Sequence, residues 1–150
     1  MNKEAQLIKF FVQDLQQDSQ SYTGLLDLLK SLNRAILARQ VELITSINDQ
    51  ITVCTLKLHE SSLRREKILQ ALNLHPQEAG VEQLIAKLPN PLGSSTQTLW
   101  QEISQRIIDC KQQNNANGKI MAMHQELITQ LLHQADNSGV YNPSYYQAFY

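Results

Sequence analysis

Apolar residues recur every seven positions through three long stretches of the chain, a spacing that places them on one face of an α-helix. In the first stretch the repeat falls on Ile8, Leu15, Tyr22, Leu29 and Ile36. In the second it falls on Ile44, Ile51, Leu58 and Leu72, and in the third on Trp100, Ile107, Met121 and Ile128. Additional apolar positions widen each stripe beyond the seam of a two-stranded coiled coil, which favours the core of a helical bundle.

Proline and glycine separate these stretches. Three of the four prolines lie between the second and third stretches, where a short amphipathic run ends at a proline. We therefore predict helices over about 3–37, 41–73 and 97–135, and a short connector helix over about 81–88. The fold class is all-α, an elongated antiparallel three-helix bundle of coiled-coil-like character. Residues 1–136 form the bundle domain and residues 137–150 a tail.

Two of the predicted helix boundaries rest on specific arguments. The first two helices are joined without glycine or proline, and the break between them is expected because one unbroken helix of about 70 residues could not bury its own apolar stripe. The run Thr98–Gln101 matches a capping box, in which a threonine hydroxyl and a glutamine three residues later satisfy free backbone amides. It predicts the start of the third long helix.

Three polar residues interrupt the stripes. Asp18 lies on the first stripe, and Ser61 and Arg65 lie on the second. Asp18 and Arg65 could pair across two helices or lie where the helix ends splay apart, and the sequence leaves both arrangements open.

The stretch NNANGKIM combines a turn signal with a helical register. Asn-Gly is typical of tight turns, yet Asn114 lies one heptad after Ile107, and Asn117 one heptad after Cys110. The amides therefore point inward or into a groove between helices. A buried amide without partners costs about 1–3 kcal/mol, and Gly118 inside a helix costs about 1 kcal/mol relative to alanine.

Three interpretations of these residues, which are unfavourable inside a helix, remain open. A turn could split the helix at residues 115–118, although the heptad register continues across it. The amides could form a polar layer that fixes the register of the bundle. Alternatively, the amides and the bare backbone at Gly118 face an open groove and bind a partner, an interpretation that the resemblance described below favours.

The composition of the chain argues against several classes of function. The net charge is −1 at pH 7, so no field of either sign supports binding to nucleic acid or to an anionic membrane. No apolar run is long enough for membrane insertion, and the first residues do not read as a secretory signal. Cys54 and Cys110 lie far apart without metal-like spacing, which is typical of reduced core thiols in a cytosolic protein.

Catalytic and metal-binding patterns are missing from the sequence. No two histidines lie four residues apart on a helix, and no phosphate loop or nucleophile motif is found. On the apolar stripe, His124 fits a core imidazole better than a metal ligand. We therefore expect no enzymatic activity, no metal and no cofactor.

The third long stretch resembles the signature helix of the FlgN-type flagellar export chaperones. In that family a tryptophan, an apolar residue three positions later and Asn-x-x-Asn-Gly follow one another. The corresponding residues here are Trp100, Ile103, Asn114, Asn117 and Gly118. Only the Asn-x-x-Asn-Gly helix is specific, although the resemblance in length and helix layout covers most of the chain.

The second stretch is similar to the same family, in which an arginine precedes a leucine-rich ending. Arg64 or Arg65 supplies the arginine here, and a lysine usual in the family fourteen residues earlier is replaced by Gln50. A Tyr-Gly turn often follows the third helix, and here Tyr141 is followed by Asn142 instead. The apolar ending comprises Ile68, Leu69 and Leu72.

The resemblance implies a cytosolic chaperone that binds the carboxy-terminal helical segments of hook–filament junction proteins. It would prevent their premature assembly and hand them to the type III export apparatus. A long bundle with a wide apolar stripe could lend one groove to such a segment. The expected client-binding residues are Asn114, Asn117, Gly118, Ile120, Met121, His124, Tyr141, Tyr145 and Tyr146.

The tail carries four of the five tyrosines and no lysine, arginine, aspartate or glutamate. Exposed aromatic clusters often mark contact surfaces. The tail could fold back onto the bundle, close over a client, or dock on components of the export apparatus. A different class of function also fits the stripes, namely a structural coiled-coil adaptor or self-oligomerising scaffold, and the oligomeric state is left open.

Overall fold

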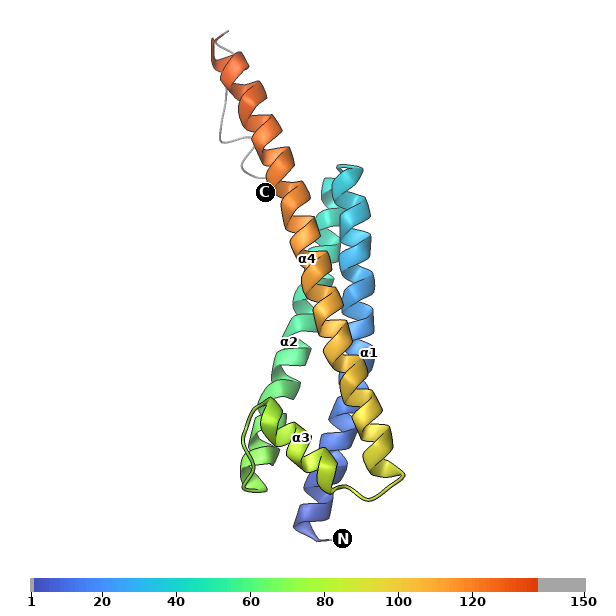
Figure 1. The fold of residues 1–150 in the computed structure, drawn as a ribbon. Coiled ribbons are helices and arrows are strands. Elements are labelled where there is room, and N and C mark those ends of the chain that lie inside the picture. The colour runs from blue at the N-terminus through green and yellow to red at the C-terminus, as the bar shows by residue number, and fades with distance from the viewer. Residues whose placement is uncertain (1, 138–150) are drawn as a thin grey trace.

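A computed structural model describes residues 2–137, which form four helices and no strand (Figure 1). The helices are α1 (Lys3–Leu37), α2 (Val41–Ala71), α3 (Glu78–Lys87) and α4 (Leu92–Asn137). The three long helices run up, down and up again, and the short α3 crosses their lower end. The prediction of an all-α helical bundle is confirmed.

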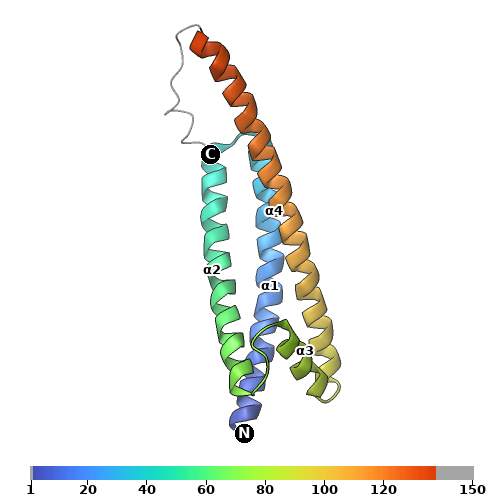
Figure 2. The ribbon, with the colours of Figure 1, turned by 60° about the vertical axis from the view of Figure 1, so that its left-hand side comes forward.

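Helix α1 lies between the other two long helices (Figure 2). It packs along both α2 and α4, whereas the backbones of α2 and α4 approach each other closely at few points among the described residues. The stripe on α1 is therefore shared between two partners. The position of α2 relative to α4 is therefore determined mainly by how each of them packs on α1.

The core consists of three clusters that follow one another along α1. Near the amino terminus of α1, all four helices contribute to the first and largest cluster. It comprises Phe11, Leu15, Ile68, Leu69, Val81, Leu84, Ile85, Trp100 and Ile103. The middle cluster comprises Leu25, Leu26, Leu29, Leu58 and Cys110, and the upper cluster Leu32, Ala35, Ile36 and Ile47. Ile120 and Met121 of α4 pack against the upper cluster.

The break between α1 and α2 is made without glycine. Arg39 adopts a left-handed backbone conformation with φ of 55°. Its N–H donates to the carbonyl of Ile36 at 3.1 Å, and the N–H of Gln40 donates to that of Ala35 at 3.0 Å. This pair of hydrogen bonds is a Schellman motif, which normally places glycine at the left-handed position. The sequence marks this helix end weakly because arginine takes that position.

Helix α4 begins five residues earlier than predicted, at Leu92 rather than at about 97. The capping-box interpretation was wrong, because Thr98 lies inside the helix and its hydroxyl donates to the carbonyl of Ser94 at 3.1 Å. The Asn90 side chain serves the helix start instead, accepting from the N–H of Ser94 at 3.2 Å. Pro91 is tolerated at the start of the helix, because proline lacks a backbone N–H and the N–H groups of the first turn have no acceptor within the helix.

The other helix boundaries lie close to their expected positions. Helix α1 spans 3–37 as predicted, whereas α2 ends two residues early and α3 begins three residues early. Differences of this size are usual at frayed helix ends. The proposed tail lies outside the described residues except for Asn137, so the division into a bundle and a tail stays a prediction.

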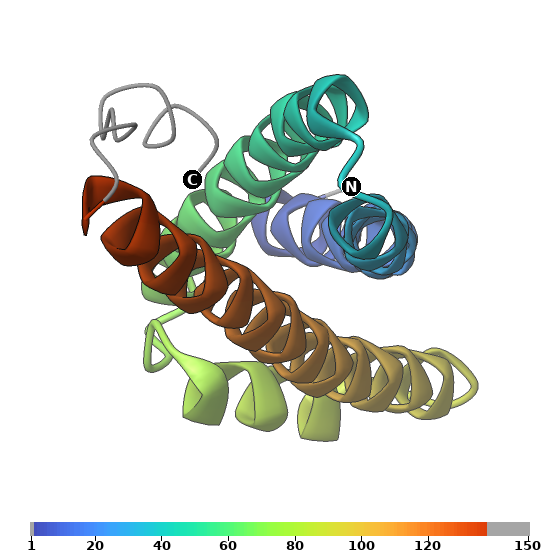
Figure 3. The same cartoon turned by 90° about the horizontal axis from the view of Figure 1, so that it is seen from above.

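Helix α4 is longer than its partners and extends past the turn between α1 and α2 (Figure 1). It has 46 residues against 35 in α1, or about 69 Å against about 53 Å. Seen from above, its last turns lie to one side of that turn (Figure 3). A segment of α4 is consequently left without a neighbouring long helix.

Candidate functional site

The polar residues that interrupt the stripes meet in one layer between the first and middle core clusters. Arg65 of α2 donates from Nη1 to Oδ2 of Asp18 on α1 at 3.0 Å. Its guanidinium also lies 5.8 Å from the ring centroid of Trp100 on α4, a cation–π distance. One arginine thus connects all three long helices, which settles the arrangement that the sequence left open.

The carboxylate in this layer is deeply buried, with 5% of Asp18 exposed. Burial raises the pKa of Asp18 above its ordinary value of 3.8. Arg65 opposes the shift, as does the hydroxyl of Ser61, which lies nearby without a hydrogen bond of ordinary length. A buried ion pair adds little net stability compared with well-packed apolar residues, whereas removal of one partner is costly because it leaves a buried charge unpaired.

A second ion pair lies beside the first but in a different environment. Nε of Arg64 donates to Oδ2 of Asp14 at 2.9 Å, and half of the Arg64 side chain is exposed. Both arginines that the sequence could match to the family therefore bind carboxylates of α1. The two ion pairs differ in exposure to solvent, so water can hydrate the charges of the Arg64–Asp14 pair more easily than those of the buried Arg65–Asp18 pair.

This difference gives a matched comparison. We expect Arg65→Ala to lower the free energy of unfolding by about 3 kcal/mol, because it leaves a buried carboxylate without its partner. Arg64→Ala should cost less than about 1 kcal/mol. Urea unfolding of both variants measures the difference. Equal losses would show that the Asp18–Arg65 pair is as well hydrated as a surface pair.

The Asn-Gly stretch does not form a turn, since α4 is continuous from Leu92 to Asn137. Instead, Asn117 is buried against α1 with 2% exposed. Its Nδ2 donates to the carbonyl of Leu29 at 2.8 Å. Its Oδ1 accepts from Asn33 and from Gln113, each at 3.0 Å. Three hydrogen bonds thus engage both ends of the amide within the chain and fix α4 against one turn of α1.

We expect Asn117→Ala to lower the free energy of unfolding by about 2 kcal/mol, because a bonded amide is lost and a small cavity forms. The control is Asn114→Ala, one turn earlier on the same helix, where the side chain is exposed; we expect a change within about 0.5 kcal/mol. Chemical denaturation of the two variants compares them. A similar small effect at both positions would mean that the Asn117 bonds do not hold the helices in register.

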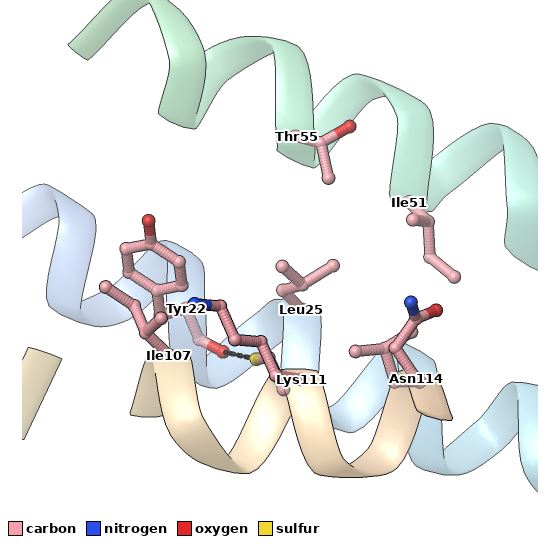
Figure 4. A pocket seen from close by; sticks show the side chains of 9 residues that line it. Tyr22, Leu25, Ile51, Thr55, Ile107, Lys111 and Asn114 are labelled. Carbon is pink, nitrogen blue, oxygen red and sulfur yellow. Dashed lines mark hydrogen bonds between the residues drawn. The ribbon is translucent and has the colours of Figure 1, made fainter. Parts of the chain in front are cut away.

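An open pocket of about 350 Å³ lies between α2 and α4. In Figure 4, Ile51 and Thr55 extend from α2 toward Leu25 on α1 and toward Asn114 on α4. The remaining lining residues are Tyr22, Leu29, Ile107, Cys110 and Lys111. Most of the lining is apolar, and Lys111 is its single formal charge.

The thiol at the base of this pocket is structural. Sγ of Cys110 donates to the carbonyl of Tyr22 at 3.7 Å, drawn as a dashed line in Figure 4. Burial raises the pKa of Cys110, and burial likewise raises that of Cys54 on α2. Thiols of raised pKa are weak nucleophiles at neutral pH. Cys110 belongs to the middle core cluster, and Cys54 packs against that cluster.

A second pocket of about 180 Å³ continues the same boundary toward the α1–α2 turn. Ile36 and Arg39 contribute from α1 and its end, and Val41 and Ile44 from α2. The residues of α4 are Met121, His124 and Ile128. Arg39 and His124 are the polar side chains of this pocket, and its other lining residues are apolar.

The two pockets follow one another between the same helices, and we call them together the α2–α4 furrow. Its α4 wall runs through Ile107, Lys111, Asn114 and Met121, which share one helix face. Gly118 lies on that face between Asn114 and Met121. A Cβ added to Gly118 would meet no atom within 4 Å. The glycine therefore leaves an open place in the wall.

The predicted client-binding residues lie in different environments in the structure. Asn114, Met121 and His124 line the furrow, Gly118 lies between its two sections, and Asn117 is buried beneath it. Ile120 is half-buried against the upper core cluster. The three tyrosines in the set lie outside the described residues: Tyr141, Tyr145 and Tyr146.

Sequence reasoning missed the part of the furrow that α1 and α2 supply. Tyr22 and Ile51 were identified as stripe residues, but their position implied a closed core. Thr55 and Lys111 carried no signal at all. A furrow forms here because α2 and α4 both pack on α1 without closing on each other, a property of helix spacing that periodicity does not encode.

The site defines a class of protein before it defines a family. The chain is a helical bundle that presents a long, mostly apolar furrow with a few amide and cationic groups, and such a groove is typical of a protein-binding module. None of the helices in the described part of the chain is long and apolar enough to cross a membrane.

The family model described as FlgN protein matches residues 1–145, and the chain belongs to that family. Membership implies a flagellar export chaperone that acts in type III export and binds flagellar export substrates. The family is one of chaperones and is not known as enzymatic. No curated protein and no solved structure matches the chain.

Proposed function

We propose that this chaperone binds the carboxy-terminal helical segments of hook–filament junction proteins in the α2–α4 furrow. It would act in the cytoplasm, prevent premature assembly of these clients and hand them to the export apparatus. The observation that carries the proposal is the open furrow. The described part of the chain leaves this mostly apolar surface between α2 and α4 uncovered. Membership of the family supports a flagellar export substrate as the client, and the furrow offers a surface that such a client could occupy.

The shape of the furrow suits a helix better than an extended strand. Its walls are helices without free backbone edges, so an occupant would be held by side chains at helical spacing. Ile51 and Ile107 offer apolar contacts in the lower section, and Met121 offers an adaptable one in the upper section. Methionine suits a surface that accepts more than one partner.

Asn114 and Gly118 give the middle of the furrow its specific chemistry. The exposed amide of Asn114 can donate to and accept from a client backbone or side chain. The open space beside Gly118 lets a client approach the α4 backbone closely. Tyr141, Tyr145 and Tyr146 remain proposed contacts that would close over a bound client or dock on the export apparatus.

The test is calorimetric titration of the full chain with carboxy-terminal segments of the host's junction proteins. The carboxy-terminal segment of flagellin is the control. We expect saturable one-to-one binding to the junction segments alone. A folded chain that binds no segment and stays oligomeric on dilution would favour the self-associating scaffold.

A pair of glycine variants tests whether the client lies in the furrow. Gly118→Leu fills the wall, whereas Gly24→Leu adds the same side chain to α1 at a site that is also exposed and open. Both should raise the free energy of unfolding by a few tenths to about 1 kcal/mol, because leucine favours helix over glycine. Only Gly118→Leu should weaken client binding, by about tenfold or more, the equivalent of about 1.4 kcal/mol. Equal affinities would remove the furrow from the binding site.

A further inference from the structure

A second row of residues follows α2 at alternating intervals of four and three positions, and every member of it is exposed. The row consists of Asp49, Val53, Leu56, Glu60, Leu63 and Lys67. The buried Leu58 lies two residues after Leu56, which is about 200° around the helix axis. The row therefore lies opposite the apolar stripe that packs on α1, and we call it the outer seam.

The outer seam has the pattern of a helix that pairs with another helix. Its apolar members are largely exposed, at 68% for Val53, 58% for Leu56 and 44% for Leu63. Helix α2 lies at an edge of the bundle, with α1 beside it (Figure 2). Apolar residues at this spacing form the seam of a coiled coil when a second helix covers them. Among residues 2–137, no helix does so.

The charges at the two ends of the outer seam identify the occupant. Asp49 lies at one end and Lys67 at the other, so the seam is complementary to a second copy of itself that runs in the opposite direction. In a twofold pair, each contact between two positions occurs twice. A register centred level with Leu58 sets Asp49 of each copy opposite Lys67 of the other. The same register sets Val53 opposite Leu63.

The charges also disfavour the neighbouring registers. A shift of one heptad in one direction would set Asp49 opposite Glu60, and like charges would repel each other at two places. A shift in the other direction would set the apolar Leu56 opposite Lys67. Of the three registers, only the centred one pairs both ends of the outer seam with opposite charges.

The centred register also has costs, which keep the pairing weak. Leu56 faces Glu60, whose methylene groups can cover the leucine only in part. Lys57 lies next to the outer seam and near the twofold axis, where it approaches its own copy. The seam spans about 27 Å, and one helix from each chain supplies fewer residues than the about 20–30 a side of a stable interface. These features predict a dimer that dissociates on dilution.

We propose that two copies of this chain pair along the outer seams of their α2 helices, in antiparallel orientation, and form a reversible dimer. The α2–α4 furrow stays open in this arrangement, because Ile51 and Thr55 line it from another side of α2. The dimer thus carries two separate furrows. The pairing does not depend on the proposed client, and it differs from the self-associating scaffold because it is lost on dilution.

Sedimentation equilibrium of the full chain without any client measures the dissociation constant of the dimer. Leu56→Glu should raise that constant at least about tenfold, because it sets glutamates opposite each other at two places. Leu131→Glu is the matched control, since this leucine of α4 is exposed to a similar degree, 63% against 58%. The control should keep the dissociation constant of the unchanged chain. Circular dichroism checks that both variants stay helical.

An exchange of charges tests the direction and the register of the pairing. Asp49→Lys alone should raise the dissociation constant about fivefold at low salt, because the new lysine faces Lys67 and the lost pair occurs twice. Asp49→Lys together with Lys67→Asp should restore the dissociation constant, since both charges are exchanged. In the register shifted toward Glu60, Asp49→Lys would strengthen the dimer instead.

Three outcomes would overturn the inference. The first is a chain that stays monomeric at the highest concentration at which it is soluble. The second is equal weakening by Leu56→Glu and Leu131→Glu, which would move the contact away from α2. The third is a double charge exchange that pairs no more tightly than Asp49→Lys alone. Because no client is present, each outcome is distinguishable from failure of client binding in the calorimetric titration.

Discussion

The packing of α1 against two partners at once is the constraint on which the rest of the structure depends. Its apolar stripe is wide enough to hold α2 on one side and α4 on the other, and the two hardly approach each other. A furrow floored by α1 follows directly. The positions of its walls are then determined by polar contacts to α1, through Arg65 at one level and Asn117 at another.

These polar contacts also show how far the sequence predicts the fold. Seven-residue periodicity was sufficient for three long helices in a bundle, because burial of a stripe dominates their stability. Two helix boundaries depend on single residues in unusual roles. The end of α1 was predicted correctly from the length of the stripe, although Arg39 takes a position normally given to glycine. The start of α4 was predicted wrongly, because Asn90 rather than Thr98 serves it. Periodicity carries no information about either.

The candidate site was predictable only in part, and for a similar reason. Heptad register correctly turned Asn114 and Asn117 toward the interior side of α4, but the two amides have different environments. Asn117 is buried and bonded to α1, whereas Asn114 and Gly118 remain open at the furrow. One motif thus combines a contact that fixes register with a surface suited to a partner. To tell which amide is buried and which faces the furrow, one must know how α4 is rotated relative to α1 and α2. The spacing of apolar residues along the sequence does not give that rotation.

The central claim is that a client helix lies in the furrow over α1, and photo-crosslinking from α2 tests it most directly. A photoreactive side chain at Thr55 would face the furrow, and one at the neighbouring Leu56 would face outward, where 58% of the leucine is exposed. With a bound junction segment, the account predicts crosslinks from position 55 and few from position 56. Equal yields from both positions, or a higher yield from position 56, would contradict it.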